Sequence, residues 1–155
     1  MLERLQSKAI QNHLVVVLDS FESCFNKRLI GSGLSPVEMV EAIWKAEFVL
    51  VSHGVESDPV FNFGNEMALR LFELDFDAFT RLPSRKSAEM ISREERQRLL
   101  DEVAARGCIS DYTGIRISSS GRRFYIENAK VWNLYDGSQE YYGQAAMFKS
   151  WKYLG

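Results

Sequence analysis

The sequence predicts an α+β domain built on an antiparallel sheet. Two short apolar runs in the middle of the chain are bounded by turn-forming residues, which is typical of strands: Phe48–Val51 and Val60–Phe63. Three longer apolar runs follow, separated by Ser-Gly and Asp-Gly turn pairs: Tyr112–Ser118, Phe124–Tyr135 and Tyr141–Trp151. Short turns favour antiparallel pairing of neighbouring strands, so we expect the last three to form a meander.

Two helices are predicted before the first strand. Residues 7–29 carry apolar side chains at spacings of four and three, which indicates one narrow helical seam: Ile10, Leu14, Val17, Phe21 and Cys24. The β-branched run at 15–17 weakens this prediction, because such residues lose rotamer freedom in helices. A second helix is expected to open at Ser35, where Ser35-Pro36-Val37-Glu38 combines a capping box with proline in the first turn.

Three further helices are predicted between the two groups of strands. Asn65 is a favoured N-cap residue before an apolar stripe, and Asp75 is expected to cap a short segment that ends before Pro83. Ser92-Arg93-Glu94-Glu95 is interpreted as another capping box, opening a longer helix that stops at Gly107. We expect four apolar residues to be buried between this helix and the sheet: Leu99, Leu100, Phe124 and Trp132.

Composition places the chain among soluble globular domains. It has 155 residues, of which 46% are hydrophobic and 26% charged, enough for one core. The formal charge of -2 favours neither a nucleic-acid partner nor an anionic membrane surface. No apolar run approaches the roughly 20 residues of a membrane span, and no signal peptide is recognised, so we expect a cytoplasmic protein. Cys24 and Cys108 are then expected to be free thiols, with a disulfide as the alternative.

Four stretches together resemble the bacterial, stand-alone form of the MEKHLA domain over roughly residues 35–151: PVFNFGNEMALRLFELDFDAFTRLPSR, SREERQRLLDEV, DYTGIRISSSGRRFYIENAKVWNLYD and GQAAMF. MEKHLA is a PAS-related family, and its plant members form the C-terminal domain of homeodomain-zipper transcription factors. The resemblance implies a PAS-like five-stranded antiparallel sheet with helices on one face, in residues 35–155, after an N-terminal helical extension in residues 1–34. It implies a sensor-like module and supplies no assigned ligand or catalytic residue.

The sequence argues against two PAS cofactor chemistries and against catalysis. Ser92–Arg106 contains no His or Cys to ligate haem, and Leu82–Lys86 lacks the cysteine that light-sensing relatives use, so we expect neither directly ligated haem nor cysteinyl-flavin photochemistry. His53 and nearby Asp58 alone do not make an acid-base or metal site, and no catalytic motif is found. The protein is therefore not expected to be an enzyme.

A ligand pocket is predicted from small residues and amides on the last strands. Gly143, Ala145 and Ala146 leave room where a filled core would hold larger side chains. The PAS resemblance points to amides on these strands as ligand contacts, and two arginines are candidate partners for an anionic ligand or, alternatively, surface residues. The tentative ligand-binding residues are Asn128, Trp132, Gln144, Arg85, Arg116 and His53.

Three functions remain open at this point. The first is a cytoplasmic sensory or regulatory module that binds a small molecule or a protein partner. The second is a ligand-free homodimerisation or protein-interaction domain, and the third is a small enzyme of cone-like α+β fold. We expect a homodimer formed through residues 7–29, because Val16, Leu18, Phe25 and Leu29 add apolar surface outside the seam.

Overall fold

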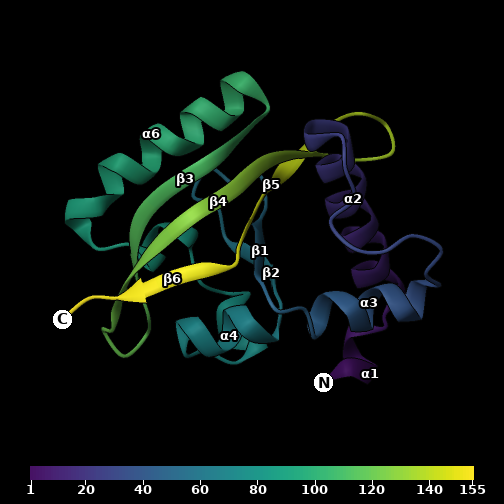
Figure 1. Cartoon of the computed structure of the whole chain (residues 1–155), viewed down its shortest axis with the longest axis horizontal. Coiled ribbons are helices and arrows are strands. Elements are labelled where there is room, and N and C mark those ends of the chain that lie inside the picture. The colour runs from purple at the N-terminus through teal and green to yellow at the C-terminus, as the bar shows by residue number, and fades with distance from the viewer.

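The computed structural model describes the backbone of residues 1–155 and every side chain except those of residues 90 and 91. The strands are β1 (Val49–His53), β2 (Phe61–Gly64), β3 (Cys108–Ile117), β4 (Arg123–Tyr135), β5 (Tyr141–Phe148) and β6 (Ser150–Tyr153). The helices are α1 (Leu2–Leu5), α2 (Lys8–Phe25), α3 (Pro36–Trp44), α4 (Glu66–Phe72), α5 (Phe76–Phe79), the 3-10 turn η1 (Ser84–Ser87) and α6 (Met90–Arg106). Figure 1 shows the sheet running between α6 on the left and α2 on the right.

All strand pairs are antiparallel, in the order β2-β1-β5-β4-β3, which confirms the predicted α+β class. The sheet has six strands where five were expected, because the run Tyr141–Trp151 is divided at Lys149. β5 pairs with the second half of β4, and β6 pairs with its first half, where Phe124 lies opposite Tyr153. One long strand, β4, therefore takes two partners in succession along the same edge.

A bulge in β4 changes which face its side chains occupy. Asn128 has a left-handed backbone, with φ of 52°, and its side chain is exposed. Before it, Phe124 and Ile126 join the core beside α4, whereas after it the odd-numbered residues take that side of the sheet. A strand alternates faces with a period of two, so one extra residue reverses the pattern.

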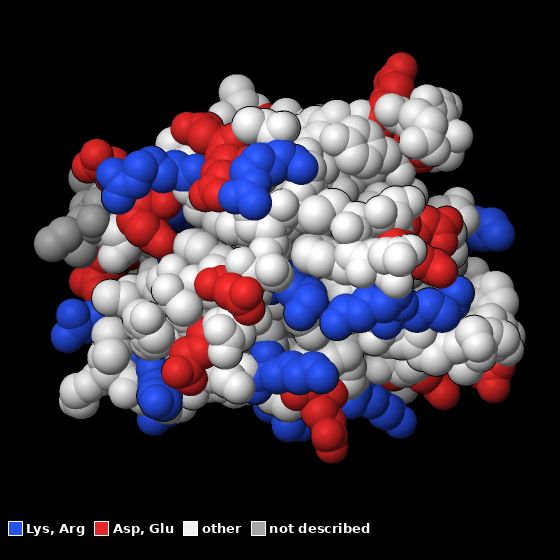
Figure 2. Space-filling model, turned by 45° about the horizontal axis from the view of Figure 1, so that its top comes forward, with Lys and Arg blue, Asp and Glu red and all other residues white. Residues whose placement is uncertain are grey.

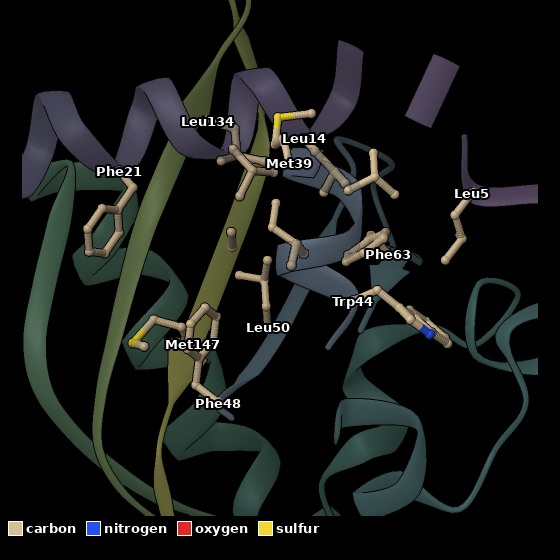
Figure 3. Close-up of a cluster of buried hydrophobic side chains, with 14 of the residues drawn as sticks. Leu5, Leu14, Phe21, Met39, Trp44, Phe48, Leu50, Phe63, Leu134 and Met147 are labelled. Atoms are coloured by element: carbon tan, nitrogen blue, oxygen red, sulfur yellow. The ribbon is translucent and has the colours of Figure 1, made fainter. Parts of the chain in front are cut away.

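This reversal moves Trp132 away from its expected position. The side chain is buried, but it lies beneath α2 and not between α6 and the sheet. Its Nε1 donates a hydrogen bond to the Val17 carbonyl at 3.2 Å, and its ring meets Phe21 edge-on at 4.9 Å. Figure 3 shows Leu14 and Phe21 of α2 directed toward the core that contains Leu134 and Met147 of the sheet. The seam predicted for residues 7–29 thus packs against the protein's own sheet.

The predicted helix caps have mixed outcomes. Ser35 and Glu38 form the reciprocal capping box of α3, and Asp75 caps α5. Asn65 caps α4 from a fully buried position, where its amide also donates to the carbonyls of Ile43 and Phe48. That one side chain consequently joins α3, β1 and α4.

The capping box predicted at Ser92 is wrong. The N-cap of α6 is Glu89, which has the extended backbone of a cap, and the Ser92 amide donates to the Glu89 carbonyl at 2.9 Å. Ser92 therefore lies inside the first turn. The pattern of Ser followed by Glu three residues later recurs within helices, and only the backbone of the preceding residue decides where the helix begins.

The expectation of two free thiols is also wrong, because Cys24 and Cys108 form a disulfide, with their Cα atoms 6.3 Å apart. Cys24 lies in the last turn of α2, and Cys108 opens β3 directly after α6. Their separation of 84 residues along the chain hid this proximity from sequence spacing. It follows from the path of α2 across the sheet, which brings its C-terminal end to the start of β3.

We expect reduction of the Cys24–Cys108 disulfide to lower the melting temperature. The bond spans 84 residues, and loop-closure entropy alone gives an upper figure of about 4 to 5 kcal/mol. Thermal unfolding with and without dithiothreitol measures the effect, and the double variant Cys24→Ser/Cys108→Ser, which should not respond to reductant, is the control. Two titratable thiols in the folded, unreduced protein would contradict the assignment.

A buried histidine links α2 to the sheet. His13 Nδ1 lies 2.9 Å from the Tyr142 hydroxyl, and Nε2 lies 2.9 Å from Ser52 Oγ. Burial lowers the pKa of His13 from 6.5 to about 4. The neutral imidazole is therefore the form that the folded protein stabilises.

Acidification is expected to destabilise the protein through His13. Its pKa is lower in the folded state, so its contribution is complete above pH 6.5 and is lost as the pH falls toward 4. For this group alone the free energy of unfolding should fall by about 3 kcal/mol between pH 7 and 4. Urea unfolding across this range should show a shallower pH dependence in His13→Gln. Equal slopes in the two proteins would contradict the prediction.

Candidate functional site

A cavity lies between the sheet and the helices α4, η1 and α6. Its volume is about 80 Å³, enough for several waters or a small organic molecule. Most of its wall is apolar and includes Phe72, Leu99, Ile126, Val131 and Phe148. Polar or charged residues interrupt that wall: Ser52, His53, Ser84, Ser87, Arg96, Tyr112, Arg116 and Gln144. An apolar pocket with a few convergent polar groups is the usual form of a small-molecule site.

The pairing of β1 with β5 brings His53 and Gln144 together. They are direct partners in the register, so their side chains emerge on the same face of the sheet. Gly143 permits the close approach of the two strands, because a Cβ atom there would lie 2.1 Å from the His53 carbonyl oxygen. Ala146, two residues beyond Gln144 on the same face, is small and leaves the space that the cavity occupies.

His53 and Gln144 each have one buried polar atom without a hydrogen-bond partner. His53 Nδ1 lies 3.0 Å from the Gly54 carbonyl, which places the proton of the neutral ring on Nδ1 and leaves Nε2 as an acceptor. Gln144 Nε2 donates to Asn133 Oδ1 at 3.0 Å, while its Oε1 has no partner among the described residues. Burial is the main cause that lowers the pKa of His53, and the charge of Arg96 adds to it; the Gly54 hydrogen bond and the adjacent Gln144 side chain oppose it.

Arg96 is a buried cation on α6. Only 6% of the residue is exposed, and its guanidinium donates a hydrogen bond to the Ser84 hydroxyl. Burial, and next the positive charge of Arg116, lowers the pKa of Arg96 to about 10, so the group stays charged at neutral pH. Within the described part of the chain, Arg96 makes no ion pair with a carboxylate.

Arg116, on β3, is buried beside its own counter-charge. Its Nη2 donates to the Tyr112 hydroxyl at 3.0 Å, and its Nη1 lies 3.7 Å from Glu95 Oε2, an ion pair too long to be a hydrogen bond. The Tyr112 hydroxyl in turn donates to Glu95 Oε1 at 2.6 Å. Burial raises the pKa of Tyr112 to about 12, so it remains a neutral donor.

The six residues predicted from sequence divide equally between the cavity and other places. His53, Gln144 and Arg116 line it. Arg85 forms an exposed ion pair with Asp58 at 3.0 Å. Asn128 is exposed at the β4 bulge, and Trp132 is covered by α2 on the opposite face of the sheet.

Arg96, Ser84 and Ser87 line the cavity and were not predicted. The sequence does contain a pattern that indicates Arg96. It precedes Leu99, Leu100 and Val103 at helical spacing, so this charged residue lies on the same face of α6 as the apolar stripe. No sequence pattern indicates Ser84 and Ser87, because their position at the cavity depends on how η1 folds. Across the described residues, no group of three or more His, Cys, Asp or Glu side chains could hold a metal ion.

The chain belongs to the MEKHLA domain family, whose model matches residues 11–153. It is 22% identical over 116 residues to the homeobox-leucine zipper protein HOX9 of Oryza sativa, in both the indica and japonica subspecies. That alignment covers 75% of this chain and 14% of the rice protein, so the chain spans about one seventh of the length of these relatives.

Similar solved structures are PAS and light-oxygen-voltage domains. A PAS domain from Colwellia psychrerythraea has a TM-score of 0.60 and 12% identity, covering 69% of this chain and 88% of that one. A PAS domain from a two-component sensor histidine kinase has a TM-score of 0.56 and 15% identity, covering 74% and 91%. An RNA-binding light-oxygen-voltage receptor has a TM-score of 0.64 and 15% identity, covering 77% of this chain and 34% of the receptor. These likenesses establish a PAS-type fold.

Proposed function

We propose that this MEKHLA domain is a sensory or regulatory module that binds a small molecule in the cavity beneath α6. The observation that carries the proposal is the pair of unpartnered atoms, His53 Nε2 and Gln144 Oε1, buried in a mostly apolar space. A buried acceptor without a donor costs free energy, and a bound ligand with a matching donor removes that cost. Binding would be reported through α6 and η1, which form one wall of the cavity.

A homodimer is a second proposal, supported by the outer surface of α2. The helix already covers its own sheet through Leu14, Val17 and Phe21, yet Val15 remains 43% exposed. Leu34 and Val37, near the start of α3, add exposed apolar surface. A ligand-free interaction domain would use the same surface. No observation in the structure favours the alternative of a small enzyme.

We further propose a cytoplasmic location without a nucleic-acid partner. In the described chain no helix is both long enough and apolar enough to cross a membrane. Figure 2 shows Lys and Arg side chains interspersed with Asp and Glu on the face in view, in line with the formal charge of -2. The Cys24–Cys108 disulfide is the observation that argues against this location, because such bonds are rare in a reducing compartment.

Native mass spectrometry of the purified protein tests ligand binding directly. We expect a folded species that carries a small co-purified molecule. The fraction of protein that carries it should be smaller in Gln144→Ala, a variant that loses the amide group and is expected to keep the fold. Tyr141→Ala, an exposed position three residues earlier on β5, is the control and should keep the adduct. The proposal would be contradicted if the native protein had only the mass calculated from its sequence at every gentle ionisation setting, and if no small metabolite raised its melting temperature.

A further inference from the structure

We propose that the cavity binds a small carboxylate that also carries a hydrogen-bond donor, with Arg96 as its counter-ion. This inference rests on the proposed ligand-binding function and names the class of ligand. Three features of the described side chains lead to it: an uncompensated positive charge, two acceptors on the cavity wall without donors, and a small, mostly apolar volume. A third buried atom without a hydrogen bond, Glu95 Oε2, lies 3.7 Å from Arg116 Nη1 and is not on the wall.

The charged groups that line the cavity or pair with its lining include one more cation than anion. Arg96 and Arg116 are both buried, and Glu95 is the one carboxylate paired with either of them among the described side chains, at 3.7 Å from Arg116. The partner of Arg96 is the neutral Ser84 hydroxyl. The neutral form of His53 adds no charge, so the balance of two cations against one anion is a net charge of +1. Buried charges in proteins are normally paired, and a bound monoanion would complete this pairing.

No nearby acid in the described part of the chain is available to replace the ligand. Asp58 is the carboxylate whose negative charge raises the pKa of Arg96. Its oxygens, however, accept hydrogen bonds from Arg85 Nε at 3.0 and 3.1 Å. That pair lies at the surface, where both side chains are at least 41% exposed. The Arg96 guanidinium therefore keeps donors for a partner inside the cavity.

A carboxylate suits this charge better than a phosphate does. A guanidinium presents two parallel N–H groups that match the two oxygens of a carboxylate. A phosphate dianion would exceed the single uncompensated charge and leave negative charge buried. The volume of about 80 Å³ suits a small ligand, and the apolar wall suits a short carbon chain.

The two unpartnered acceptors require a donor on the same ligand. Neutral His53 offers only a lone pair at Nε2, and Gln144 offers Oε1. These residues are adjacent across β1 and β5, so one ammonium group, which has three donors, can satisfy them together, whereas a hydroxyl group, which has one donor, satisfies one of them. A plain carboxylate would neutralise Arg96 but leave both acceptors unsatisfied. Hydroxy acids of three or four carbons combine a single negative charge with one donor. Amino acids of that size offer three donors and a carboxylate for Arg96, but as zwitterions they leave the net charge unchanged.

Matched acids and amides test the proposal. Lactate and lactamide share size and hydroxyl group and differ in charge, and alanine and alaninamide form a second such pair. We expect at least one acid of three or four carbons to bind the purified protein in calorimetry, with its amide at least ten-fold weaker. Propionate, which lacks the hydroxyl, should also be weaker than lactate. Amides that bind as tightly as their acids would overturn the proposal, as would failure of every acid to bind.

Arg96→Met tests the counter-ion. The substitution removes the buried charge and keeps an apolar stem, so the ligand-free protein should melt no lower than the parent, whereas stabilisation by the acid should be lost. Arg98→Met is the matched control, because Arg98 lies two residues away on α6 with its side chain 70% exposed, and this variant should keep the response. Acid binding that persists in Arg96→Met overturns the role of Arg96. Should that variant fail to fold, Arg96→Lys keeps the charge and should retain binding at reduced affinity, and unchanged affinity would count against the guanidinium.

Failure of this inference is distinguishable from failure of the proposed function. If a neutral molecule co-purifies with the protein and no acid displaces it, the proposed ligand-binding function stands and the proposal of a carboxylate ligand is wrong. A protein that holds no co-purified molecule and binds neither acids nor amides overturns both.

Discussion

A bulge at Asn128 decides which face of the sheet each later side chain of β4 occupies. β4 is the longest strand, and its side chains must serve two cores, one beneath α2 and one beside α4 and α6. The extra residue reverses the alternation, so Val131 and Asn133 face α6 while Trp132 and Leu134 face α2. Without it, the tryptophan would occupy the cavity side of the sheet.

The same reversal places Trp132 where α2 packs on the sheet, and two further contacts hold the ends of that helix. Trp132 beneath α2 gives the helix an aromatic platform and a hydrogen bond from its ring to the Val17 carbonyl. The helix then runs across the sheet, so that Cys24 meets Cys108 at one end and His13 meets Ser52 nearer the other. With α2 closing one face, α6 is left to cover the other, and the space it leaves unfilled is the cavity.

Local signals in the sequence predict most elements of the fold, and long-range geometry accounts for the rest. Asn65 and Ser35 cap their helices as expected, because capping depends on three or four neighbouring residues. Trp132 was expected on the wrong face because one bulge reverses every side chain after it, and a bulge has little sequence signature. The disulfide joins residues 84 apart, and no spacing rule connects them.

The candidate site is predictable in part for the same reason. His53 and Gln144 can be proposed as polar residues on apolar strands, whereas Arg96 was not predicted although it stands on the stripe of Leu99 and Val103. A charge on an apolar helical stripe is a signal for a buried ion, and the amino-acid sequence alone contains it. Arg85 is a plausible anion partner by residue type, but its position beside Asp58 at the surface depends on how η1 folds.

Arg96, His53 and Gln144 are proposed to converge on one ligand. A crystal structure of the protein as purified, at a resolution that shows ordered water, tests this most directly. We expect density for a small molecule with its anionic end at the Arg96 guanidinium and a donor at His53 Nε2 or Gln144 Oε1. A cavity that holds only water, with Arg96 turned to pair with a carboxylate of its own chain, would contradict it.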